Sequence, residues 1–522
     1  MSNHTHRPAA EHEPRRFPVT VSPTVLGFIG SLFILIGSFG AGWIGDGLGI
    51  REWFPIAFFR SSPDLTRLCT MLLIVGGFLL LIAWIRFRPS IRDDDASLRR
   101  VIRTAVIWAL PLLICIPVFS RDMFSYVAVG RLMAAGIDPY QHGVNEIAGW
   151  YSLGVDPFWS STESPYGPLF LGVAAVFSWL GAEIPEYALF LNRVAATAGA
   201  VLMVMAFLKI AALRGRNRAF VAWMIAANPL TLLLFIASGH NDGLMLAGMG
   251  FGLLAALKGH RVLGVVWIAL AVAIKPIALI ALPIVALIGR PSSLPVWDRV
   301  KSWTLHGAIA VGLVGAIGLV LGLGFGWVTA LTVPGAIQHW YSPLTLMVGT
   351  VRGLAELVAL DPFVFEVILK VIAFSIAGLV AAWVVLTKRP IDPLLRLVLC
   401  TAVIVAASTA IHPWYVMWIL PFAAVAGPWR KGQEHLAMLV TIFFTTVTLA
   451  EPTDSFFEGP YTRIAVASIT VLFALSVLVW WWRSSNVSGR AVVIAVPYGQ
   501  VLVDWWSARR QRKLRQRADT QR

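Results

Sequence analysis

Apolar and polar segments alternate along almost the whole chain, from about residue 23 to residue 482. The longer apolar runs hold about 20 residues, the length of helix that crosses the ~30 Å hydrocarbon core of a bilayer. This pattern predicts an all-α polytopic membrane protein with about fourteen transmembrane helices. The expected spans are residues 23–45, 67–87, 101–120, 187–212, 218–237, 241–258, 262–274, 277–290, 304–325, 363–386, 393–411, 413–428, 436–450 and 461–482.

The composition agrees with a membrane protein. The 522 residues are 58% hydrophobic and only 13% charged, whereas soluble domains carry about 25% charged residues. Cys69, Cys115 and Cys400 all lie in apolar runs. Their spacing indicates neither a disulfide framework nor a zinc site.

The distribution of charge predicts the orientation. The formal net charge is +15, and most basic residues fall in alternate short loops and in the tails, which is the positive-inside pattern. We therefore expect a multi-pass protein of the cell membrane with both termini cytoplasmic. It would consist of a tail (1–22), a transmembrane domain (23–482) and a basic tail (483–522). That basic tail suits anionic membrane lipids, so no nucleic-acid partner is expected.

The same rule places residues 121–186 on the outer side, where they include one more apolar run near 166–180. If this run crossed the bilayer, Arg214, Arg216 and Arg218 would move to the outer side, against the charge rule. At about 15 residues it is also short for a span. We expect a surface or re-entrant helix in this first large outer loop.

Two charged residues stand out because charges at membrane helices are costly unless they have a function. Asp122 follows directly on an apolar run, and Lys275 with Pro276 separates two runs that are each short for a span. Each of these residues also has an explanation that involves no function. An acid in a first turn after Ser120 suits a helix N-terminus, and a lysine can reach the interface with its flexible stem.

The polar turn 238–242 lies between two apolar runs on the same outer side. A tight turn by itself accounts for Gly239 and Asn241. It does not require both His240 and Asp242, and one use for Asp242 would be to pair with Lys275.

Four motifs, in order along the chain, carry a resemblance to a known family. They are Arg121-Asp122-Met123-Phe124-Ser125-Tyr126, Ser164-Pro165-Tyr166-Gly167-Pro168, Gly239-His240-Asn241-Asp242 and His412-Pro413-Trp414-Tyr415. With them the chain resembles GT-C glycosyltransferases, and more closely the polyprenol-phosphate-mannose-dependent α-1,6-mannosyltransferases of actinobacterial lipomannan synthesis. The resemblance covers most of the chain except the tails. It implies a GT-C fold and an outward-facing active site that transfers mannose, with inversion, from polyprenyl-phosphate mannose to a mannan-bearing glycolipid.

The resemblance also implies a role for Asp122, and the positions of the basic residues indicate which of them could bind the phosphate. Asp122 would be the base, because joining a sugar to a hydroxyl requires removal of the hydroxyl proton. The departing polyprenyl phosphate needs positive partners, for which Lys275 ranks first and Arg121 second. Arg131 ranks lower, because nine further residues at about 100° each put it on the opposite face of a helix from Asp122.

The remaining candidates are hydrogen-bonding or aromatic side chains that suit the binding of sugars. They are Tyr126, Tyr140, Tyr166, His240, Asn241, Asp242, His339, Trp340, His412, Trp414 and Tyr415. Aromatic belts at membrane interfaces give a similar pattern. The sequence has no glycine-rich nucleotide loop, and its run of three aspartates at 93–95 lies in a cytoplasmic loop. We therefore expect neither a metal nor another cofactor.

Two alternatives remain open from the sequence. One is a transporter or lipid flippase, in which the break at Lys275-Pro276 would be the binding site and Asp122 only a cap. The other is a GT-C enzyme that uses a different lipid-linked sugar.

Overall fold

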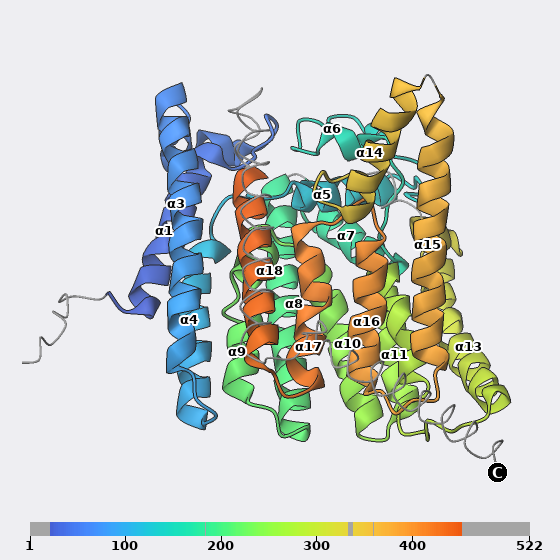
Figure 1. The fold of residues 1–522 in the computed structure, drawn as a ribbon. Helices are drawn as coiled ribbons and strands as arrows, with labels where there is room; N and C mark the ends of the chain where they lie inside the picture. The colour runs from blue at the N-terminus through green and yellow to red at the C-terminus, as the bar shows by residue number, and fades with distance from the viewer. Residues whose placement is uncertain (1–20, 183, 332–337, 359, 452–522) are drawn as a thin grey trace, which may run out of the picture.

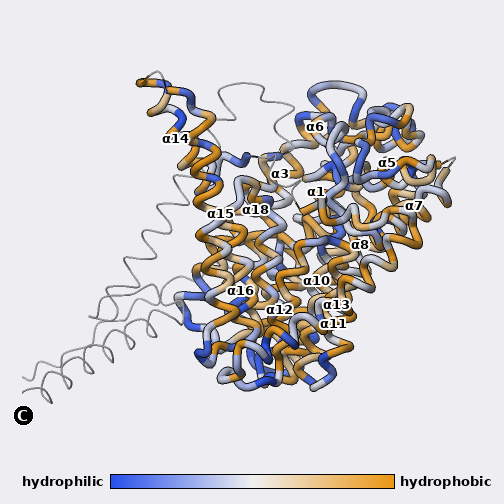
Figure 2. Tube along the Cα trace, turned by 90° about the vertical axis from the view of Figure 1, so that its right-hand side faces the viewer, coloured by the Kyte–Doolittle hydropathy of each residue, from blue (hydrophilic) through white to orange (hydrophobic). Residues whose placement is uncertain are grey.

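The computed structural model describes residues 21–182, 184–331, 338–358 and 360–451. Within these ranges all regular structure is helical, and the long helices run roughly parallel to one another (Figure 1). Apolar residues dominate the middle of the bundle, while polar residues gather toward its two ends (Figure 2). These features confirm the expected helical membrane protein.

The helices are α1 (Pro23–Ala41), α2 (Phe54–Phe59), α3 (Pro63–Phe87), α4 (Asp95–Leu113), α5 (Asp122–Ala134), α6 (Pro157–Ser160), α7 (Pro168–Leu180), α8 (Pro185–Leu213), α9 (Arg218–Ile225), α10 (Asp242–Leu257), α11 (Arg261–Val272), α12 (Leu282–Val285), α13 (Val296–Val320), α14 (Pro343–Leu357), α15 (Pro362–Leu386), α16 (Pro393–Ala406), α17 (Leu420–Ala426) and α18 (Lys431–Ala450). A π-helix occupies Thr231–Ala237, and 3-10 helices occupy, among other segments, Pro276–Ala281 and Pro413–Trp418.

Six helices in the described ranges are long and apolar enough to cross a membrane: α1, α3, α8, α13, α15 and α18. The expected number of about fourteen spans is therefore not confirmed. Several expected spans are shorter or broken, because prolines remove backbone donors and end helices. One break is the predicted one at Lys275-Pro276, and Pro413 is the predicted start of a separate segment, whereas the break at Pro229 was not predicted. The expected span 461–482 lies outside the described residues, as do the tails 1–20 and 483–522.

The two ends of the bundle differ. Ion pairs join the loops at the end opposite α5, linking segments that are far apart in the sequence. These pairs are Arg88 with Glu434, Arg214 with Asp392 and Arg218 with Asp95. At the other end lie α5, α6 and α14 (Figure 1). The basic loops and the first large loop thus occupy opposite ends.

Helix α7 packs against α5 and α8. Its 13 residues extend only about 20 Å, less than the ~30 Å core of a bilayer. The contact with α5 is close, because Ser178 Oγ donates a hydrogen bond to the carbonyl of Val127 (2.9 Å). A Cβ at Gly130 would lie 2.2 Å from that same hydroxyl oxygen. This length agrees with the expected surface or re-entrant helix.

Candidate active site

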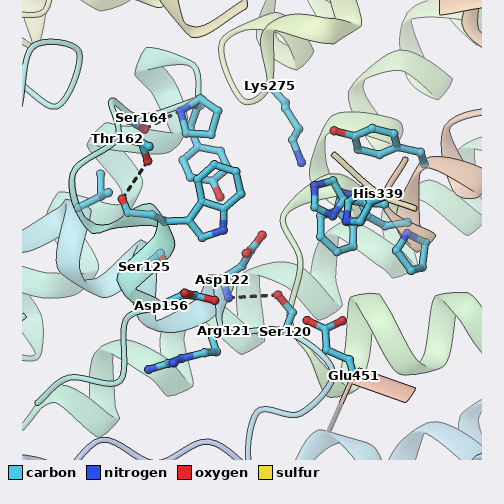
Figure 3. Close-up of a pocket in the computed structure, with 18 of the residues that line it drawn as sticks. Ser120, Arg121, Asp122, Ser125, Asp156, Thr162, Ser164, Lys275, His339 and Glu451 are labelled. Atoms are coloured by element: carbon cyan, nitrogen blue, oxygen red, sulfur yellow. Dashed lines mark hydrogen bonds between the residues drawn. The ribbon is translucent and has the colours of Figure 1, made fainter. Parts of the chain in front are cut away.

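A cavity of about 490 Å³ lies at the α5 end of the bundle (Figure 3). Its walls come from the start of α5, the loop before α7, the break at Lys275, the segment 339–341, the start of the 413–418 helix and the end of α18. The lining residues are Ser120, Arg121, Asp122, Ser125, Val129, Val144, Asp156, Trp159, Thr162, Glu163, Ser164, Pro165, Tyr166, Lys275, His339, Trp340, Tyr341, His412, Pro413, Trp414, Tyr415, Val447, Ala450 and Glu451. Three of the four motifs, together with Lys275, therefore meet in one cavity, and the fourth lies directly behind it.

Asp122 is the first residue of α5, and its side chain lies in the cavity wall (Figure 3). Its backbone N–H donates to Ser120 Oγ (3.2 Å), so Ser120 satisfies one amide of the first turn. Its Oδ2 lies 3.1 Å from Nδ1 of the fully buried His240. Burial alone would raise the pKa of Asp122, but His240 and, more weakly, Lys275 lower it to about 2. The carboxylate is therefore ionised throughout the physiological range.

The turn that carries His240 is fixed by its backbone. Gly239 has φ +73°, the left-handed region that favours glycine, and a Cβ there would lie 2.0 Å from Cε of Met123. Ser238 Oγ donates to the carbonyl of Val118 (2.6 Å). The N–H of Asn241 donates to the hydroxyl of Tyr126 (3.3 Å). The turn is thus tied to α5 and to the segment that precedes it.

Arg193 of α8 connects the two backbone segments that lead to Asp122 and to His240. It is 7% exposed, and its Nη1 donates to the carbonyls of Leu112 (2.9 Å) and Ile236 (3.2 Å). These carbonyls end α4 and the π-helix, the two elements that lead to Asp122 and to His240. Buried carbonyls at helix ends need such donors, so Arg193 joins the two backbone segments.

Lys275 also lies in the cavity wall, with its side chain 13% exposed. Its Nζ contacts both carboxylate oxygens of the fully buried Asp242 (3.0 and 2.9 Å). Trp418 Nε1 donates to the same carboxylate (2.6 Å). The pair predicted between Asp242 and Lys275 is present, and Asp242 fixes the position of the ammonium group.

The motif at 164–168 holds this break in place. The N–H groups of Gly167 and Phe170 donate to the carbonyls of Ile274 (2.9 Å) and Ala273 (3.1 Å), the two residues before Lys275. A Cβ at Gly167 would lie 2.4 Å from the carbonyl of Ala273. A glycine is needed here because the two backbones are in direct contact.

Aromatic rings packed against one another, some stacked and some edge-on, form the wall that faces Asp122. The ring of Trp414 lies 4.0 Å from that of His240 and 4.1 Å from that of His412, and His339 lies 4.6 Å from His412. Burial lowers the pKa of His339 to about 4, and its Nδ1 accepts a hydrogen bond from the N–H of Ile411 (3.1 Å). The His339 ring is therefore neutral near pH 7, which suits a site for an uncharged sugar.

The two arginines are placed differently from Lys275. Arg121 donates to the carbonyls of Gly154 and Val155 (both 2.8 Å), and its guanidinium lies 4.0 Å from the ring centre of Trp43. Figure 3 shows it directed away from Lys275. Arg131 donates to the carbonyl of Ala182 and is not among the cavity residues.

The other predicted residues divide into two groups. Tyr166, His339, Trp340, His412, Trp414 and Tyr415 line the cavity. Tyr126, Tyr140, His240, Asn241 and Asp242 do not line it and lie behind its wall, where Tyr140 donates through its hydroxyl to the carbonyl of Tyr166 (2.8 Å).

The lining residues that were not predicted from the sequence include three acids and a tryptophan: Asp156, Glu163, Glu451 and Trp159. The concentration of polar residues in the outer loop was a signal for Asp156 and Glu163. Glu451 follows α18, and only the fold brings it to the cavity. Among the described residues, no group of three or more His, Cys, Asp or Glu side chains is arranged to hold a metal ion.

Comparison with known proteins identifies the kind of site. A family model described as alpha-(1->6)-mannopyranosyltransferase, N-terminal domain, matches residues 24–290, and one for the MptB C-terminal domain matches residues 344–480. The chain belongs to the alpha-(1->6)-mannopyranosyltransferase family. The matched ranges contain Asp122, His240, Lys275 and His412. The chain is therefore a glycosyltransferase, which sets the transporter alternative aside.

Named relatives support the assignment over nearly the full length. Alpha-(1->6)-mannopyranosyltransferase A of Mycobacterium tuberculosis is 28% identical over 520 residues, which cover 95% of this chain and 99% of that protein. The A enzyme of Corynebacterium glutamicum is 27% identical, covering 81% of this chain and 97% of its own. The B enzyme of that organism is 25% identical, covering 88% and 81%. No solved structure matches the chain.

Proposed function

We propose that this mannosyltransferase has a GT-C type of fold and transfers mannose, with inversion, from polyprenyl-phosphate mannose to a mannan-bearing glycolipid, forming α-1,6 linkages. The observation that carries the proposal is that an ionised carboxylate, Asp122, and an ammonium group, Lys275, line one cavity. The first suits a general base, and the second suits a phosphate leaving group.

The proposed reaction is a single displacement at the anomeric carbon. The 6-hydroxyl oxygen of the acceptor attacks C1 of mannose from the face opposite the phosphate, and the C1–O bond to phosphate breaks with its electron pair going to the phosphate. Asp122 takes the hydroxyl proton. Because its pKa is lowered to about 2, Asp122 is ionised, and so able to accept a proton, at the start of each turnover.

The phosphate is assigned to Lys275 and not to Arg121. The donor phosphodiester carries one negative charge and the departing polyprenyl phosphate close to two, so a nearby cation stabilises the transition state more than the ground state. The Arg121 guanidinium is held by loop carbonyls on the far side of Asp122. Arg131 lies outside the cavity and receives no role.

The outer face of the membrane is proposed from the arrangement of charge. The cavity lies at the end that carries α5, opposite the loops with Arg88, Arg214 and Arg218. Basic loops lie on the cytoplasmic side in most membrane proteins. A cavity that opens outward suits a donor that is carried on a lipid rather than a cytosolic sugar nucleotide.

The direct test uses purified protein in liposomes with a short α-1,6-linked mannosyl lipid as acceptor. Labelled polyprenyl-phosphate mannose is expected to give an elongated α-1,6 product, whereas GDP-mannose and polyprenyl-phosphate arabinose are expected to give none. Equal transfer from GDP-mannose would contradict the lipid-linked donor, and preferential transfer of arabinose would contradict the sugar.

The acceptor is proposed to enter at the acidic side of the cavity. Asp156 and Glu451 lie on the opposite side of Asp122 from Lys275 (Figure 3), and Glu451 is exposed. Carboxylates accept charge-assisted hydrogen bonds from sugar hydroxyls and repel phosphate. An inverting displacement also requires the acceptor to lie opposite the leaving group.

Asp156→Asn is expected to raise the acceptor KM about tenfold, because one charge-assisted bond becomes a neutral one. The donor KM should stay the same. The Asn side chain can still accept from the N–H of Phe158, as Asp156 does (2.9 Å), so the loop is retained. Glu146→Gln is the matched control, since Glu146 is an exposed acid of the same loop outside the cavity. A change confined to the donor KM would contradict the assignment.

A further inference from the structure

His240 is an unusual neighbour for a base that must face a substrate. It is fully buried and absent from the cavity wall, yet its Nδ1 lies 3.1 Å from Oδ2 of Asp122. It therefore does not touch a substrate in the cavity directly. Both ring nitrogens are buried, and neither meets the geometry of a hydrogen bond among the described residues. The close approach of Nδ1 to the Asp122 carboxylate is therefore the polar contact that the structure gives this ring.

The ring has little freedom to turn away from Asp122. The left-handed backbone at Gly239 and the bond from Ser238 to Val118 fix the turn on one side of the ring. The ring of Trp414 covers one face at 4.0 Å. A side chain held this firmly keeps a charged neighbour in one rotamer, which is what a supporting group does for a catalytic group.

We propose that His240 is a positioning residue, which holds one carboxylate oxygen of Asp122 so that the other faces the acceptor hydroxyl. The inference rests on the proposed role of Asp122 as base. It replaces the sugar-binding role that the sequence predicts for His240. The two roles differ in a measurable way, because a positioning residue acts only through Asp122.

The test is a double-mutant cycle on mannosyl transfer with Asp122→Asn and His240→Phe, which keeps a ring against Trp414. His240→Phe alone is expected to lower kcat about tenfold to one-hundredfold, because the carboxylate loses a charge-assisted contact, with both KM values nearly unchanged. In the Asp122→Asn background the same change is expected to lower kcat less than about twofold. An equal loss in both backgrounds would overturn the proposal.

Two further variants guard against a trivial loss of folding. His240→Asn places an N–H donor near the position of Nδ1 and is expected to recover part of kcat. His142→Phe is the matched control, because His142 lies 3.1 Å from Glu146 but is exposed and outside the cavity. It should leave kcat unchanged. Failure of His240→Asn to exceed His240→Phe in a folded protein would count against a contact through Nδ1.

A readout independent of turnover separates this inference from the proposed function. In protein labelled with ¹⁵N-histidine, the ring nitrogen signals of His240 are expected to shift in Asp122→Asn and to stay unchanged in Asp64→Asn. Unchanged signals in Asp122→Asn would overturn the contact even if the wild type transfers mannose. A shift in a protein that transfers no mannose would support the contact and leave only the proposed function in error.

Discussion

Asp122→Asn is expected to lower kcat for mannosyl transfer by about 10²- to 10⁴-fold, the range over which a general base accelerates a reaction. Asparagine has nearly the same shape and keeps the backbone N–H that Ser120 accepts (3.2 Å), so α5 should still begin at residue 122. The donor KM should change little, because the phosphate is assigned to Lys275. Initial rates with labelled polyprenyl-phosphate mannose measure both parameters.

Asp64→Asn provides a matched control for that prediction. Asp64 also lies in the first turn of a helix, two residues after a serine, but its side chain is 89% exposed and outside the cavity. A variant that only disturbed helix capping would give similar losses at both positions. Full kcat in Asp122→Asn would refute the role of Asp122 as base. Equal losses of kcat in Asp122→Asn and Asp64→Asn would indicate that Asp122 only stabilises the start of its helix.

The pH dependence of the wild type follows from the same carboxylate. The pKa of Asp122 is lowered to about 2, so the basic form is fully present above about pH 4. Asp122 should therefore cause no acid limb in a kcat profile between pH 5 and 8. By linkage, the ionised group stabilises the folded state above about pH 4, and this contribution disappears as the pH falls toward 2.

Most of the site residues predicted from the sequence line the cavity, and the charged ones could be found because charges are rare in a membrane protein. Asp122 and Lys275 stood out because a charged side chain at a membrane helix is energetically costly. In the structure both line the same cavity. The partner of Asp242 was also predictable, since a buried lysine and a buried acid near the same surface each need a countercharge.

The sequence did not predict the direction in which side chains point. Arg121 adjoins Asp122, but the carbonyls of Gly154 and Val155 fix its guanidinium on the far side. His240 was predicted to contact sugar, but the left-handed turn at Gly239 places it behind the wall. Both outcomes depend on contacts between distant segments, which local sequence patterns do not contain.

Helix lengths, too, could be predicted only in part from local sequence patterns. The break at Lys275-Pro276 was predictable because a charge and a proline coincide there. At Pro229 the preceding Asn228 is polar but fully buried, and the nearby Ala227 and Leu230 are apolar and fully buried. Hydropathy therefore continues through the break and predicts one span. The π-helix that follows packs against α4 and α8, and hydropathy gives no sign of these contacts.

The second large effect is expected when Lys275 loses its charge. Lys275→Met should lower kcat by about 10²- to 10³-fold, because a preorganised charge at the site of developing negative charge contributes on that scale. The donor KM should rise less than kcat falls, since the phosphate gains charge as the bond to C1 breaks. Steady-state kinetics with polyprenyl-phosphate mannose measure the two effects.

The single variant leaves the carboxylate of Asp242 fully buried without its ammonium partner (2.9 Å), which alone costs stability. The decisive variant is therefore Lys275→Met with Asp242→Asn, which removes both charges and keeps an acceptor for Trp418 Nε1. Asp242→Asn alone retains the ammonium group and should keep activity within about tenfold of wild type. If the folded double variant matches Asp242→Asn in kcat, Lys275 serves only to neutralise Asp242, and another group must bind the phosphate.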